Sequence, residues 1–136
     1  MPVYDLYTDG AYKNKVGSFG YVLSCDGRQI DSGYGIVGSG KYMNSVIAEY
    51  YALSHGLDAF VRKTDKPKPV LNVYNDSKFV TDCVNKEIHE YPELQIISMK
   101  LKQIRRYATV NISWIARTKN KLANDLAKKL RSVSDC

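Results

Sequence analysis

The dipeptide Asp26-Gly27 is the local feature that most narrows the fold available to this chain. Such a pair between two strand-like stretches is a strong signal for a tight β-hairpin, and here residues 18–25 and 28–37 flank it. Residues 3–9 are rich in aromatic and branched side chains and predict a third strand, which ends at a turn near Gly10. Together these segments predict a three-stranded antiparallel meander at the start of the chain.

The rest of the chain alternates between helical and strand-like patterns. A helix capped by Asn44 or Ser45 is expected to reach residue 61, because apolar side chains recur at steps of three and four. The charged, proline-containing residues 63–69 form a connection. We then expect a strand over 70–75, a helix capped by Asp76 or Ser77 to about 84, a helix over 92–107, a strand over 109–115 and a terminal helix after 119. This order predicts one mixed α/β domain spanning residues 1–136.

The charge balance favours a polyanionic partner. Lys and Arg total 20 against 14 Asp and Glu, giving a formal net charge of +6, although many basic proteins bind nothing anionic. The cysteines, Cys25, Cys83 and Cys136, form neither an even disulfide set nor a metal-binding pair, and no signal segment opens the chain. No apolar run approaches the roughly 20 residues that span a bilayer. We therefore expect a cytoplasmic protein that does not insert into membranes.

Three isolated carboxylates stand in segments otherwise built for a core. Asp9 and Asp76 end predicted strands and Glu49 falls early in a predicted helix, where each has an ordinary explanation as a cap or as a complement to the helix dipole. Brought together, they would repel one another unless a cation neutralised them. Oxygen ligands favour Mg²⁺ or Mn²⁺, and two such ions about 4 Å apart cleave phosphodiesters. An acidic cluster in a basic protein therefore suggests a nuclease.

Four short segments carry a resemblance to a known family. Tyr7-Thr8-Asp9-Gly10-Ala11, Ala48-Glu49-Tyr50-Tyr51-Ala52-Leu53, Tyr74-Asn75-Asp76-Ser77 and Trp114-Ile115-Ala116-Arg117 follow one another in the order of the signature regions of type 1 ribonuclease H. The resemblance covers residues 3–129. It implies a five-stranded mixed sheet, its first three strands antiparallel, flanked by about four helices. It also implies an endonuclease that hydrolyses the RNA strand of RNA–DNA hybrids with two Mg²⁺ or Mn²⁺ ions, held in part by Asp9, Glu49 and Asp76.

The fourth acidic position of the family is where this sequence departs from it. Laid without a gap on residues 120–127, the family's terminal-helix pattern places Asn124 in the acidic slot and Asp125 one residue late. Adjacent helical residues point about 100° apart, so the two lie on opposite flanks of the predicted buried stripe, which includes Leu122 and Ala123. We assign Asn124 to the catalytic and metal-binding set. An asparagine carbonyl can coordinate a metal but adds no charge, so ion binding should weaken.

A second departure precedes the terminal helix, where many family members carry a histidine in a longer loop. This chain offers Arg117 there, as some members do, and a fixed cation could stabilise a charged transition state or help release phosphate. The alternative is an ordinary surface charge. Neither His55 nor His89 falls in that loop.

Recognition of the hybrid depends on contacts to 2′-hydroxyl groups and phosphates. By position in the resemblance, Gly10 and Ala11 would contribute backbone contacts, and Asn44, Ser45 and Lys78 side-chain contacts, although Asn44 is equally explained as a helix cap. Residues 85–91 are too short and too acidic for the family's extra basic helix. Phosphate contacts would then fall to basic residues drawn from Lys100, Lys102, Arg105, Arg106, Lys119 and Lys121.

A different reading is a catalytically weakened ribonuclease-H-like module that binds hybrid or structured nucleic acid. Asn124 favours this alternative, whereas the three intact carboxylates favour an enzyme. In either case we expect a monomer whose partner is an RNA–DNA hybrid.

Overall fold

A computed structural model of the chain describes residues 2–87 and 91–134, with the side chains of 131–134 left aside. Five strands form one sheet in the order β3-β2-β1-β4-β5. The elements are β1 (Val3–Lys13), β2 (Val16–Cys25), β3 (Arg28–Ser39), α1 (Ser45–Lys63), β4 (Val70–Asn75), α2 (Lys78–Lys86), α3 (Pro92–Ile104), β5 (Thr109–Trp114), the short 3₁₀ turn η1 (Arg117–Lys119) and α4 (Lys121–Ser134). Among the described residues, no helix is long and apolar enough to cross a membrane.

The sheet is mixed, as the sequence predicts. The strands β1, β2 and β3 pair antiparallel, while β4 runs parallel to both β1 and β5. The predicted hairpin at Asp26-Gly27 is confirmed, because both residues have positive φ values, 50° and 84°, as a tight two-residue turn requires. Parallel pairing of β1 with β4 brings the carboxyl end of β4 beside the middle of β1.

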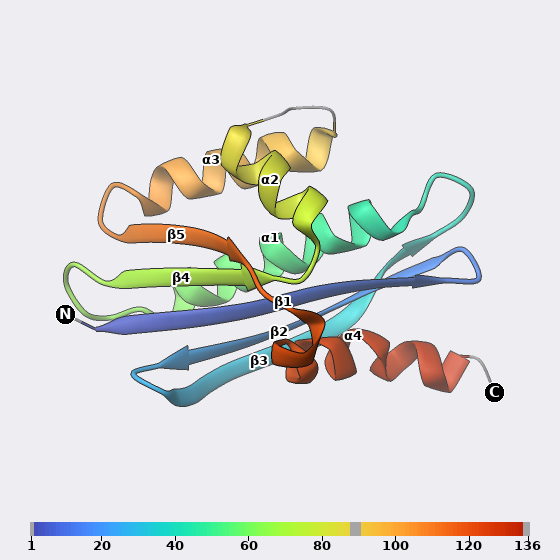
Figure 1. Cartoon of the computed structure of the whole chain (residues 1–136), viewed down its shortest axis with the longest axis horizontal. Helices are drawn as coiled ribbons and strands as arrows, with labels where there is room; N and C mark the ends of the chain where they lie inside the picture. The colour runs from blue at the N-terminus through green and yellow to red at the C-terminus, as the bar shows by residue number, and fades with distance from the viewer. Residues whose placement is uncertain (1, 88–90, 135–136) are drawn as a thin grey trace.

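Helices cover the two faces of the sheet unequally (Figure 1). One face packs against α1, on which α3 lies, and the core between them contains Tyr4, Leu6, Leu57, Phe60 and Leu71. The other face carries α4, which crosses β2 and neighbouring strands. A Cβ added to Gly20 of β2 would lie 2.6 Å from the Ala127 nitrogen, so the absent side chain is what lets α4 lie directly on the strand.

The strand that carries Asp9 is longer than predicted, and the expected turn at Gly10 is wrong. Residues Gly10 to Lys13 continue the antiparallel pairing with β2, and the turn comes at Asn14-Lys15, both with positive φ. Gly10 is needed for another reason, since a Cβ there would collide with the backbone of Ala48 and Glu49. The missing side chain allows α1 to approach β1 closely at this point.

Other boundaries move by a few residues, and one core prediction fails. The helix predicted over 92–107 ends at Ile104, and the strand predicted to 115 ends at Trp114. Leu122, predicted on the buried stripe of the terminal helix, is 63% exposed. The small residues Ala123 and Ala127 make the close contact with the sheet instead, and Leu122 projects about 100° away from Ala123.

Candidate metal centre and active site

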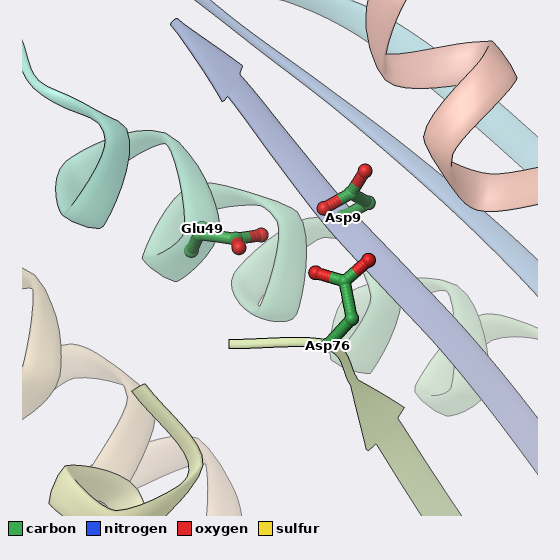
Figure 2. Close-up of side chains that lie close together, drawn as sticks. All are labelled: Asp9, Glu49 and Asp76. Atoms are coloured by element: carbon green, nitrogen blue, oxygen red, sulfur yellow. The ribbon is translucent and has the colours of Figure 1, made fainter. Parts of the chain in front are cut away.

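Three carboxylates from distant segments meet at one point of the sheet (Figure 2). Asp9 lies in the middle of β1, Glu49 in the second turn of α1, and Asp76 directly after β4. One carboxylate oxygen from each lies within 4.8 Å of the others. Asp9 was expected at the end of a strand but lies within β1. Strand β4 is the one that ends here: its last residue, Asn75, pairs with Thr8, so Asp76 lies beside Asp9.

Backbone and amide donors hold Glu49 in place. The Gly10 N–H donates to Oε1 of Glu49, which is the close approach that the missing Cβ of Gly10 permits. The Nδ2 of Asn75 donates to the same oxygen at 3.2 Å. Glu49 is buried although it is acidic, and these two donors compensate part of the cost of removing it from water.

Two buried asparagines position the cluster, and the sequence reading missed both. Besides contacting Glu49, Asn75 donates to the Thr8 carbonyl at 3.2 Å and accepts from the Ser77 N–H at 2.8 Å. Asn120 donates through Nδ2 to the Thr8 carbonyl at 2.9 Å and to Oδ2 of Asp76 at 3.4 Å. For Asn75 the sequence carried a local signal of burial, because it stands in alternation with Leu71 and Val73 at the end of the strand 70–75.

Asn120→Ala should lower both stability and activity. It removes a buried side chain that ties η1 to β1 and to the Asp76 carboxylate, so we expect the free energy of unfolding to fall by about 1–3 kcal/mol. Denaturant unfolding measures this loss, and we expect any hybrid cleavage to slow about tenfold as Asp76 shifts. Asn85→Ala is the matched control, since it removes one exposed amide bond to the Ile112 carbonyl. Equal unfolding energies for the two variants would contradict a positioning role for Asn120.

Burial and nearby negative charge make Asp9 and Glu49 hard to ionise. Desolvation and the nearby charge of Asp76 raise the pKa of Asp9 to about 6, although the Asn124 amide and Arg117 act in the opposite direction. Desolvation, followed by the charge of Asp9, raises the pKa of Glu49 well above its ordinary value. Mg²⁺ and Mn²⁺ prefer oxygen ligands, so a divalent cation bound here would stabilise the ionised form of the carboxylates.

Helix α4 places the amide of Asn124 at this cluster, whereas the carboxylate of Asp125 lies outside it. Asn124 donates through Nδ2 to Oδ2 of Asp9 at 2.6 Å. The neighbouring Asp125 is exposed and does not line the pocket described below. In the structure the side chain of Asn124, and not that of Asp125, lies beside the carboxylates.

The carboxylates form the floor of an open, polar pocket of about 450 Å³. Of the residues predicted from the sequence, this pocket brings together Asp9, Gly10, Ala11, Ser45, Glu49, Asp76, Arg117 and Asn124. The sequence reading did not select Tyr12, Ser77 and Lys128, which also line it. Arg117 and Lys128 place two cations beside the carboxylates, where they could contact the phosphates of an anionic substrate.

Two predicted contact residues lie outside the pocket. Asn44 caps α1, accepting from the Ile47 N–H at 2.9 Å, and Lys78 is the exposed first residue of α2. Among the predicted phosphate contacts, Lys100 binds Asp58 at 2.9 Å and so joins α3 to α1. His55 stacks on Phe19 with ring centroids 4.1 Å apart, while His89 lies outside the described residues.

Comparison with known proteins identifies the family. Residues 7–130 match the family model described as reverse transcriptase-like. The chain belongs to the reverse transcriptase-like family. No curated protein matches it at a significant level. The site described above therefore lies in a reverse transcriptase-like domain, within the matched residues.

Solved structures show that this family member has the ribonuclease H fold. The N-terminal RNase H domain of a Mycobacterium tuberculosis protein is 19% identical, with a TM-score of 0.80 and all of both chains covered. RNase H1 from the archaeon Halobacterium salinarum is 22% identical, with a TM-score of 0.78 over 98% of this chain and 99% of that one. LC11-RNase H1, isolated from compost and crystallised with an RNA/DNA hybrid, is 20% identical, with a TM-score of 0.73 over 93% and 94%. The resemblance to type 1 ribonuclease H is thereby confirmed for the fold.

Proposed function

We propose that this reverse transcriptase-like protein is an endonuclease that hydrolyses the RNA strand of RNA–DNA hybrids. The observation that carries the proposal is the convergence of Asp9, Glu49 and Asp76 within 4.8 Å on the floor of an open pocket. A similar fold binds an RNA/DNA hybrid in the LC11-RNase H1 structure, which supports hybrid as the substrate.

The residues that would hold divalent ions are these three carboxylates, with the Asn124 amide as a neutral fourth ligand. Two Mg²⁺ or Mn²⁺ ions bound with the substrate would supply an activated water and stabilise the leaving oxygen. The protein's own part is to hold the ligand oxygens in place. Gly10 and Asn75 do so for Glu49, and Asn120 does so for Asp76.

The remaining lining residues bind and orient the substrate. Gly10, Ala11 and Ser45 line the same pocket as the carboxylates, and their backbone groups and the Ser45 hydroxyl would contact 2′-hydroxyl groups of the RNA strand. The guanidinium of Arg117 acts on the charged phosphate, either by stabilising the transition state or by helping the product leave.

A second function, that of a catalytically weakened binding module, is favoured by one observation. Asn124 donates a hydrogen bond to Asp9 where a fourth carboxylate would add negative charge. In such a module the pocket would still attract nucleic acid through its cations, but it would hold ions too weakly for turnover.

A gel assay on labelled substrates separates the two functions. The full chain is incubated with an RNA–DNA hybrid, an RNA duplex and a DNA duplex, in Mg²⁺ and separately in Mn²⁺. We expect cleavage of the RNA strand of the hybrid alone, with binding that weakens steeply as salt rises. Hybrid binding without cleavage in either metal would instead favour the binding module, and cleavage of all three substrates would reject hybrid specificity.

A further inference from the structure

A second cavity, of about 380 Å³, lies on the face of the sheet that α4 covers. Its floor comes from the three antiparallel strands and its wall from η1 and the first turn of α4. The residues that matter for the argument are Tyr7, Val22 and Gln29 in the floor and Lys119, Lys121 and Leu122 in the wall. Nothing in the proposed cleavage chemistry uses this cavity.

The aromatic side chain of Tyr7 lines this cavity. Tyr7 stacks on Tyr74 of β4 with ring centroids 5.0 Å apart and an interplanar angle of 25°. Strand β1 lies between β4 and β2, so Tyr7 has Tyr74 as its partner on one side and Val22 on the other. Tyr74 stacks on the Tyr7 ring, and Tyr7 and its β2 partner Val22 both line the cavity. A planar group placed there would extend the existing stack.

The cavity is cationic. Lys119 and Lys121 line it, and none of the described residues that line it is an aspartate or glutamate. Two acids lie two positions from Tyr7 on β1: Asp9 belongs to the candidate active site and accepts from the Asn124 amide, and Asp5 accepts hydrogen bonds at 3.3 Å from Asn72 and from the Tyr74 hydroxyl. Those bonds hold the Asp5 carboxylate toward β4, away from the lysines. The cavity thus attracts an anion next to an aromatic surface.

An aromatic surface beside two ammonium groups matches the chemistry of a nucleotide. Stacking on an aromatic side chain holds a base of any sequence, and lysines bind the attached phosphate. The amide of Gln29 and the hydroxyl groups of Ser24 and Thr118 supply donors and acceptors for a base edge.

The cavity directly adjoins the candidate active site. Consecutive residues of η1 line the two pockets, Arg117 the acidic one and Thr118 and Lys119 the cationic one. Because neighbouring Cα atoms are about 3.8 Å apart, the two pockets meet at η1, within reach of successive nucleotides of one strand. We propose that the cavity binds an unpaired nucleotide of a strand that extends beyond the candidate active site. The choice of a strand over a free nucleotide rests on the proposed function.

Binding of a single strand, measured without divalent ions, tests this site independently of cleavage. The probe is a fluorescein-labelled oligothymidylate of about eight nucleotides, and the readout is fluorescence anisotropy in EDTA. The double variant Lys119→Gln/Lys121→Gln should weaken binding about tenfold. The slope of log affinity against log salt concentration should become shallower by the amount that about two phosphate contacts contribute. The control, Lys66→Gln/Lys68→Gln, removes the same charge from exposed positions in the loop before β4 and should change binding less than twofold.

Tyrosine variants test the stacking surface. Tyr7→Leu should weaken binding of the oligonucleotide about tenfold, whereas Tyr7→Phe keeps the ring and should bind within about twofold of the unmodified chain. If Tyr7→Leu does not fold, the lysine pair and Tyr7→Phe still decide the matter.

Three results would overturn the inference. The first is equal binding by the two double-lysine variants, and the second is equal binding by an acidic peptide of the same length. The third is competition by thymidine monophosphate at the concentration of the oligonucleotide, which would indicate a free-nucleotide site. An absence of hybrid cleavage with variant-sensitive oligonucleotide binding would reject the proposed function alone. Cleavage with variant-insensitive binding would reject this inference alone.

Discussion

Asp9→Asn should slow cleavage of an RNA–DNA hybrid by about a thousandfold while stabilising the metal-free protein. The variant keeps the size of the side chain but removes a charge that would hold a divalent ion, a contribution worth several kcal/mol to the transition state. The same charge destabilises the fold, because burial and Asp76 raise the pKa of Asp9 from 3.8 to about 6. Above that pH, removing the charge of Asp9 should raise the free energy of unfolding by about 2–3 kcal/mol.

The pH dependence of this gain follows from the direction of the shift. A carboxyl group whose pKa is higher in the folded state stabilises the fold most below its unfolded pKa, and the contribution is lost as the pH rises through about 6. Denaturant unfolding in EDTA should therefore show little difference between Asp9→Asn and the unmodified chain at about pH 3, and the gain should grow to its full size above about pH 7. Adding Mg²⁺ should stabilise the unmodified chain more than the variant.

Asp5→Asn is the matched control for both readouts. It makes the same substitution on the same strand, at a partly buried side chain that accepts bonds from Asn72 and Tyr74 but lies outside the carboxylate cluster. We expect it to leave cleavage within about threefold and not to stabilise the metal-free protein, because it removes a charged acceptor of two hydrogen bonds. If Asp9→Asn cleaves as fast as Asp5→Asn, the carboxylate cluster is not the catalytic centre.

Features set by local sequence were the ones that could be predicted. The hairpin at Asp26-Gly27 depends only on two residues with positive φ, and Ser77 caps α2 through a bond to an N–H three residues ahead. The turn expected at Gly10 shows the limit of such signals. A glycine marks a turn and a close approach by another backbone in the same way, and only the position of α1 reveals which one applies.

The long-range polar contacts of the site could not be predicted. Asn75 contacts Glu49, which is 26 positions away in the sequence, and Asn120 contacts Thr8, which is 112 positions away. No periodicity in the sequence indicates such pairs. The acidic residues themselves were identified only because motifs placed them in order and parallel pairing could bring the end of β4 next to β1. Lys128 was missed because a lysine on an amphipathic helix normally belongs to the solvent-exposed face.

Asn124→Asp is the substitution that should increase activity. It would place a fourth carboxylate where an amide now donates to Asp9 Oδ2 at 2.6 Å, and we expect Mg²⁺-dependent hybrid cleavage to rise roughly 10- to 100-fold. The same change replaces a hydrogen bond by repulsion between two carboxylates. The metal-free variant should therefore unfold about 4 °C lower for each kcal/mol lost, and Mg²⁺ should raise its midpoint more than that of the unmodified chain.

Asp125→Ala distinguishes this explanation from a one-residue shift in the helix. Asp125 is exposed and lies outside the pocket, so its removal should leave cleavage and Mg²⁺ stabilisation nearly unchanged. If Asp125→Ala abolishes cleavage, the acid one residue late supplies the fourth ligand, and the assignment of Asn124 is wrong. If Asn124→Asp lowers stability without raising either Mg²⁺ affinity or rate, the amide bonded to Asp9 is a structural contact, and three carboxylates are the whole charged set of this site.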